Sequence, residues 1–134
     1  MEDLVKNQTN PEISGLKVLI VEDDEGSAML VELMIRKFSN KILTAITGIE
    51  AVEVCRNNPD IDLILMDARM PEMDGYEATG IIRQFNTNVI IISQTAFALI
   101  GDQEKAIKAG CNDYITKPIA KEQLMAMIGK YFKK

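Results

Sequence analysis

Four polar positions in this sequence each follow a short apolar run and carry a group suited to phosphoryl chemistry. They are the acidic run Glu22-Asp23-Asp24, the acid Asp67, the hydroxyl of Thr95 and the amine of Lys117. Carboxylates brought together repel one another unless a cation neutralises them, and all-oxygen ligands select a hard ion such as Mg²⁺. An acidic run alone is equally typical of a solvated helix N-terminus, but an acid that ends a buried strand has little structural reason to be there. These residue types predict Mg²⁺-assisted phosphoryl transfer to a carboxylate nucleophile.

Several other kinds of site are excluded by what the sequence lacks. The chain contains no histidine, so it has no Ser-His catalysis, no imidazole zinc site and no phosphohistidine of its own. The turn after the first apolar run is acidic and would repel a nucleotide phosphate, and the glycine motifs of dinucleotide, P-loop and hydrolase sites are missing. Cys55 and Cys111 are too few and too far apart in sequence for a disulfide framework, so we expect free buried thiols.

Short aliphatic runs alternate with longer helical patterns, which indicates repeated strand-helix units and a parallel sheet. The expected strands are Lys17–Val21, Ile42–Ile46, Asp62–Met66, Val89–Ser93 and Asp113–Thr116. The expected helices are Gly26–Phe38, Gly48–Asn57, Gly75–Phe85, Leu99–Ala109 and Lys121–Phe132, with Gly110 ending the fourth. The first, third and fourth strands are continuously apolar and belong mid-sheet, whereas the mixed second strand suits an edge. Because parallel strands end at one edge, the four polar positions should meet in one cleft.

Length and charge narrow the class of protein. A chain of 134 residues has room for one domain, which we expect over residues 15–134, after a polar tail or linker at 1–14. Twenty acidic against fifteen basic residues give a net charge of −5, which disfavours nucleic-acid binding. The longest apolar runs, such as Ala96–Ile100, are too short to span a bilayer, so we expect a cytoplasmic protein without direct membrane contact.

Four segments resemble the receiver domain of two-component response regulators. They read KVLIVEDD, LILMDARMPEMDG, SQTA and GCNDYITKP, at Lys17–Asp24, Leu63–Gly75, Ser93–Ala96 and Gly110–Pro118. The resemblance covers about Leu16–Phe132. It implies an α/β flavodoxin-like, three-layer sandwich with a doubly wound, five-stranded parallel sheet of order 2-1-3-4-5. It also implies a signalling domain that assists its own phosphorylation and dephosphorylation rather than an enzyme, with any kinase activity in another domain or chain.

The resemblance assigns a role to each residue of the cleft. Asp67 would accept a phosphoryl group from a partner's phosphohistidine. Asp23 and Asp67 would ligate Mg²⁺ together with the backbone carbonyl of Arg69, while Glu22 would act mainly through bound water. Asp24 matches a less constrained position.

Three further residues would hold the phosphoryl oxygens by the same resemblance. Lys117 and the Thr95 hydroxyl would each pair with one oxygen, and the Ala96 N–H would be a further donor. The Lys117–Pro118 bond is expected to be cis. Thr95 and Tyr114 would form the family's switch, in which Thr95 moves toward the phosphoryl group and Tyr114 fills the space.

The expected partner is a histidine kinase or a histidine phosphotransfer protein, and the chain is expected to be a monomer or weak homodimer. Eight of the thirteen residues Gly26–Phe38 are apolar, more than one core-facing stripe requires. Either part of this helix faces outward and docks the partner, with Met29 in the contact, or the helix is buried more deeply. Phe97 is expected to hinder attacking water and to lengthen the phosphorylated lifetime.

The sequence favours a receiver excised from a hybrid sensor kinase, and a free-standing single-domain regulator acting by protein contact is the closest alternative. An Mg²⁺-dependent aspartyl phosphatase is less favoured, because its pattern needs a second aspartate where Arg69 stands. A degenerate receiver that serves only as an interaction module is disfavoured, since every motif residue is present.

Overall fold

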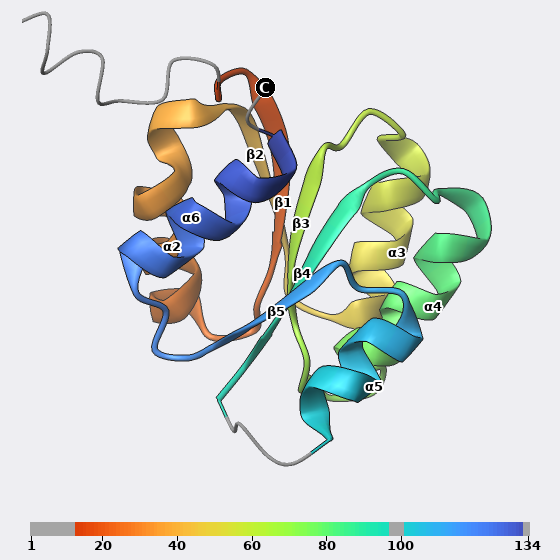
Figure 1. Cartoon of the computed structure of the whole chain (residues 1–134). Coiled ribbons are helices and arrows are strands. Elements are labelled where there is room, and N and C mark those ends of the chain that lie inside the picture. The colour runs from red at the N-terminus through yellow and green to blue at the C-terminus, as the bar shows by residue number, and fades with distance from the viewer. Residues whose placement is uncertain (1–12, 97–100, 133–134) are drawn as a thin grey trace, which may run out of the picture.

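The computed structural model describes residues 13–96 and 101–132, and their strands form one parallel sheet in the order β2-β1-β3-β4-β5 (Figure 1). This order is the one expected. The strands are β1 (Leu16–Val21), β2 (Ser39–Ala45), β3 (Leu63–Asp67), β4 (Ile90–Thr95) and β5 (Asp113–Thr116). The helices are α2 (Glu25–Ile35), the 3-10 turn η1 (Arg36–Phe38), α3 (Gly48–Asn57), α4 (Gly75–Phe85), α5 (Asp102–Ala109) and α6 (Lys121–Phe132).

Helices cover both faces of the sheet: α2 and α6 lie on one side, and α3, α4 and α5 lie on the other (Figure 1). Side chains alternate between the two faces along each strand, so the central strands must be apolar on both. On β1, Leu19 packs under α3 and α4 while Ile20 packs under α2 and α6. The core therefore forms two layers, and the continuous apolar runs of β1, β3 and β4 follow from that burial.

The first expected helix and the second strand differ from their expected bounds because of local packing. The helix expected over Gly26–Phe38 is α-helical only to Ile35 and then tightens into η1, which turns the chain into β2. β2 begins at Ser39 rather than Ile42, since its polar first residues pair with β1 on the outer edge of the sheet. Polar residues are tolerated there because one side of an edge strand faces water.

The strands that carry the predicted chemistry are longer at their carboxyl ends than expected. β3 ends at Asp67 rather than Met66, and β4 ends at Thr95 rather than Ser93. Asp67 pairs with Gln94, and Thr95 pairs with Thr116 of β5. Asp67 and Thr95 are thus anchored in the sheet itself, which holds their positions more firmly than a loop would.

The fourth helix begins later than expected in the described part of the chain. α5 starts at Asp102, after Gly101 at φ 91°, a left-handed conformation that a helix cannot continue through. The expected start at Leu99 lies outside the described residues. Gly110 ends the helix at φ 116°, as the sequence predicts.

The first described residue already belongs to the core. Ile13, within the segment expected to be a tail, is 5% exposed and packs in the layer under α2 and α6. Across the described ranges, no helix has the length and apolar character needed to cross a membrane.

Candidate functional site

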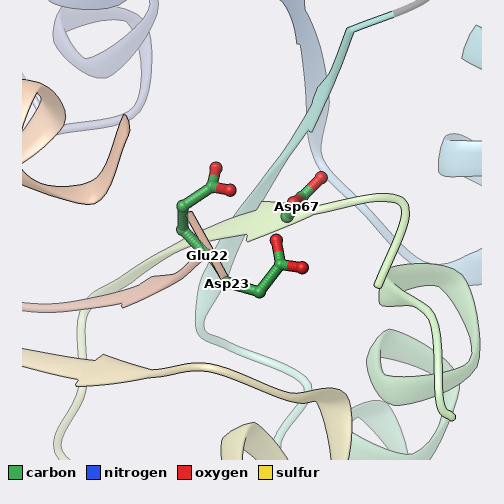
Figure 2. A group of neighbouring side chains, drawn as sticks. All are labelled: Glu22, Asp23 and Asp67. Carbon is green, nitrogen blue, oxygen red and sulfur yellow. The ribbon is translucent and has the colours of Figure 1, made fainter. Parts of the chain in front are cut away.

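Three carboxylates meet at the carboxyl ends of β1 and β3. Glu22, Asp23 and Asp67 each offer one oxygen, and these oxygens all lie within 4.8 Å of one another. Figure 2 shows the three side chains close together, with the Asp23 carboxylate directed toward Asp67 and Glu22 beside them. Glu22 and Asp67 are buried, whereas Asp23 is exposed. The convergence predicted from the strand ends is therefore confirmed for these acids.

Lys117 lies against two of these acids. It follows β5 and precedes Pro118 through a cis peptide bond, as the family resemblance implies. Its Nζ donates to Glu22 Oε1 at 2.5 Å and lies 3.6 Å from Asp67 Oδ2. The lysine ammonium is thus the cation that partly balances the buried acids.

Burial and neighbouring charges shift the pKa values of Asp67 and Lys117. Burial, followed by the neighbouring charge of Glu22, raises the pKa of Asp67 from 3.8 to about 6, against the opposing effect of Lys117. Burial alone would lower the pKa of Lys117, but the hydrogen bond to Glu22 and the charges of both acids raise it. One ammonium is therefore not enough to relieve the crowding of the carboxylates, and a further cation would be favourable.

Asp24 has a different function from its two acidic neighbours. Its side chain accepts a hydrogen bond from Ser27 N at 2.8 Å and caps α2. Hydrogen bonding with the side chain of Ser27, followed by that with its backbone, lowers the pKa of Asp24. The acidic run thus combines both interpretations drawn from the sequence: two members face the cleft, and the third caps a helix.

Arg69 connects the site to α5. Its backbone N–H donates to Asp67 Oδ1 at 3.2 Å, and its guanidinium lies 3.9 Å from the buried Asp102 carboxylate. Asp102 was not among the predicted site residues, because an acid at the start of a helix looks like an ordinary N-terminal residue.

The remaining predicted residues lie at the same edge of the sheet. Thr95 is fully buried, and its carbonyl accepts from Lys117 N at 2.7 Å. Ala96 follows it and is exposed. Tyr114 is half-buried and pairs with Ser93. Because Ser93 and Thr95 are two residues apart on β4, Tyr114 lies on the same face of the sheet as Thr95. Phe97 lies outside the described residues.

Part of α2 faces outward, which answers the question left open by its composition. Met29, Leu30 and Leu33 are 59%, 60% and 54% exposed, while Val31 and Ile35 are buried. These three exposed residues form what we call the α2 strip. Its exposure excludes the deeper burial of the helix.

Gln94, the residue before Thr95 on β4, was not among the predicted site residues. It is fully buried, and neither its Nε2 nor its Oε1 has a hydrogen-bond partner in the part of the chain that the structure describes. Burial of this kind cannot be read from the residue type, since glutamine is usually exposed.

The assembled groups can bind a hard cation and place a carboxylate beside a buried ammonium. An electrophile with several negative oxygens would be attracted to the cation and to Lys117, while the Asp67 carboxylate remained available to attack it. The arrangement fits a phosphoryl acceptor.

Comparisons with known proteins agree with this chemistry. Residues 18–129 match the family model described as the response regulator receiver domain. The chain is 38% identical over 121 residues to a hybrid signal transduction histidine kinase G from Dictyostelium discoideum, covering 87% of this chain and 4% of that protein. The chain therefore spans only a small part of that relative.

Two solved structures show the same fold. A co-crystal structure of the Saccharomyces cerevisiae histidine phosphotransfer protein Ypd1 with the receiver domain of Ssk1 matches at 32% identity and a TM-score of 0.82, over 90% of both chains. The receiver domain of a sensor histidine kinase from Pseudomonas aeruginosa, with magnesium coordinated in its active-site cleft, matches at 36% identity and a TM-score of 0.79. That match covers 90% of this chain and all of the other.

Proposed function

Because the chain belongs to the response regulator receiver domain family, we propose that Asp67 accepts a phosphoryl group from a phosphohistidine on a partner protein. The observation that carries this proposal is the position of Asp67. Its carboxylate is buried at a strand end, beside two other acids and 3.6 Å from the Lys117 amine. No purely structural role requires three acids and a lysine at one point.

Magnesium fits the donor set of this cluster. All the side-chain ligands are carboxylate oxygens. Burial and the charge of Glu22 raise the pKa of Asp67, so a divalent cation would stabilise its ionised form. Asp23, Asp67 and the Arg69 carbonyl would hold the ion directly, and Glu22 would act mainly through water. The ion would neutralise charge on the phosphoryl oxygens during transfer.

The chain's own residues would perform the remaining steps. An Asp67 oxygen would form a bond to phosphorus as the P–N bond of the phosphohistidine breaks, with the electron pair of that bond leaving on the imidazole. Lys117, the Thr95 hydroxyl and the Ala96 N–H would stabilise the phosphoryl oxygens. Lys117 already lies near Asp67, so a small shift away from Glu22 would bring it to the phosphoryl group.

Phosphorylation would then change the output surface through Thr95 and Tyr114. Thr95 would move toward the new phosphoryl oxygens, and Tyr114 would turn into the vacated space. Phosphorylation would thereby favour one of two conformations of the domain. Support comes from their places on adjacent strands and on the same face of the sheet.

The partner would be a histidine kinase or a histidine phosphotransfer protein that docks on the α2 strip. The related yeast receiver was solved together with such a phosphotransfer protein, and the strip exposes three large apolar side chains beside the acidic edge. The two free, buried thiols fit a reducing compartment, so we place the domain in the cytoplasm.

Intact mass after incubation with acetyl phosphate and Mg²⁺ tests the proposal. The parent chain should gain the mass of one phosphoryl group, and Asp67→Asn should gain none. Asp24→Asn, which removes a nearby acid that only caps α2, should react like the parent. Equal labelling of the parent and Asp67→Asn, or no labelling of the parent, would contradict the proposal.

A further inference from the structure

Gln94 is a buried amide in an apolar layer. It precedes Thr95 on β4 and lies on the same face as Ile92, which packs in the layer under α2 and α6. Its side chain is fully buried, yet neither amide atom forms a hydrogen bond with the residues described. A glutamine in this condition has lost its contacts with water without replacing them, which is unusual for a buried polar group.

An open pocket of about 400 Å³ lies beside this glutamine, between α2 and the chain that follows β5. Its lining is mainly apolar and includes Leu30, Val31, Met34, Pro118, Ile119 and Gln94. The volume lies within the range of small-molecule sites, roughly 300–1,000 Å³, and is larger than one protein side chain would fill.

Gln94 belongs to the lining of this pocket, although both of its amide atoms are covered in the present conformation. Turning the amide toward the pocket would break no hydrogen bond with the described residues. A ligand that offered both a donor and an acceptor would satisfy both atoms at once. The charged group in the lining is Lys117, whose ammonium is already held by Glu22 and Asp67. Because that positive charge is already paired with two acids, the group that best complements the Gln94 amide is a neutral carboxamide.

We propose that this pocket, which we call the Gln94 pocket, binds a small, largely apolar molecule that carries one primary carboxamide. The apolar part would lie between α2 and Ile119, and the carboxamide would pair with Gln94. Lys117 and Ala96 also line the pocket, so its occupant would lie directly beside the phosphorylation site proposed above. The inference does not rest on that function, because binding can be measured without phosphorylation.

An NMR titration of the full chain with benzamide tests the proposal, and acetophenone is the matched probe. The two molecules have nearly the same shape, but acetophenone has a methyl group where benzamide has the amide NH₂. Benzamide should shift the Gln94 side-chain NH₂ signals and the methyl signals of Leu30, Val31 and Ile119. It should bind about tenfold more tightly than acetophenone, the effect of one added hydrogen bond.

Two variants separate pairing with Gln94 from simple filling of an apolar hollow. Gln94→Leu should bind both probes equally, and Ile119→Trp, which fills the pocket and keeps Gln94, should bind neither. An unchanged preference for benzamide in Gln94→Leu would overturn the inference. So would the absence of localised shifts in the parent, which would leave water as the only partner of Gln94.

Discussion

Lys117 shares its ammonium unequally between two acids. It bonds Glu22 at 2.5 Å and lies 3.6 Å from Asp67, so the proposed acceptor is the less neutralised of the two. The Asp67 carboxylate is buried, carries a raised pKa and keeps one oxygen on the Arg69 N–H. The negative charge of ionised Asp67 is therefore only partly neutralised by its neighbours, so binding of a metal cation to this carboxylate would be favourable.

The raised pKa of Asp67 predicts how stability depends on pH without metal. The unfolded chain loses this proton near pH 3.8 and the folded chain near pH 6, so stability should fall as pH rises between these values. Asp67→Asn carries no such charge. In EDTA at about pH 7 it should therefore be more stable than the parent by about 1–2 kcal/mol, a value reduced for partial solvation of the site.

Urea denaturation at about pH 7 and about pH 4.5 measures this difference. The advantage of Asp67→Asn should shrink at the lower pH, where the folded parent keeps its proton. A parent that is the more stable of the two at neutral pH in EDTA would contradict the prediction.

Asp23 should contribute strongly to Mg²⁺ affinity. Its carboxylate is the exposed member of the cluster and faces Asp67. Asp23→Asn therefore removes a charged ligand without disturbing the buried residues of the site. Calorimetry should show Mg²⁺ binding weakened at least about tenfold. Glu25→Gln removes an acid from the start of α2 outside the cluster and is the control. An equal loss in both variants would mean that only the general negative potential attracts the ion.

The start of α4 can approach the end of β3 closely because Gly75 has no side chain. A Cβ on Gly75 would contact the Asp67 carbonyl oxygen and lie 2.9 Å from Met66 Cγ and 3.0 Å from Ala68 Cα. The Gly75 N–H donates to the Ala68 carbonyl at 3.0 Å, so helix and strand end approach at backbone distance. This glycine therefore helps to set the position of Asp67.

Gly75→Ala should destabilise the fold by about 2 kcal/mol or more, because backbone atoms must move to admit the methyl group. Gly80→Ala in the same helix is the matched control. A Cβ there meets nothing within 4 Å, so alanine should stabilise the chain by about 0.5–1 kcal/mol through helix propensity. Thermal unfolding measures both changes, and similar effects of the two substitutions would show that the contact at Gly75 relaxes freely.

The complete fold separates two surfaces on opposite sides of the sheet. The α2 strip lies over one face, and α5, with exposed Ile107, lies over the other (Figure 1). The α2 strip is apolar and adjoins the Gln94 pocket, whose lining includes Leu30, whereas the residues exposed around Ile107 on α5 are polar or charged. A partner that delivers a phosphoryl group is therefore expected over α2, which leaves the α5 side available for output.

Met29→Glu should slow transfer from a phosphorylated histidine phosphotransfer protein that labels the parent chain, by about tenfold or more. Ile107→Glu introduces the same charge on α5 and should leave transfer unchanged. Phosphorylation by acetyl phosphate should be equal in all three proteins, as followed by intact mass. Slower labelling by acetyl phosphate in Met29→Glu would mean that the substitution damages the site rather than the docking surface.

Most elements and the cleft could be predicted because their signals are local or periodic. α3, α4, α6 and β5 have the expected bounds, and the sheet order agrees with the expectation. The boundaries that differed depend on neighbours: Ser39 joins β2 because β1 pairs with it, and Gly101 precedes α5 in a left-handed conformation. The pattern of apolar and polar residues does not show which residues will pair or which glycine will adopt a left-handed conformation.

The order of apolar runs and polar strand ends was enough to indicate which residues meet, since parallel strands bring their carboxyl ends to one edge. It could not indicate how the charges are shared. Only the packed chain places Lys117 nearer to Glu22 than to Asp67 and buries Gln94 without a hydrogen-bond partner among the described residues. Hydrogen bonds and burial depend on distances of a few ångströms between residues far apart in sequence, and those distances exist only after the layers have packed.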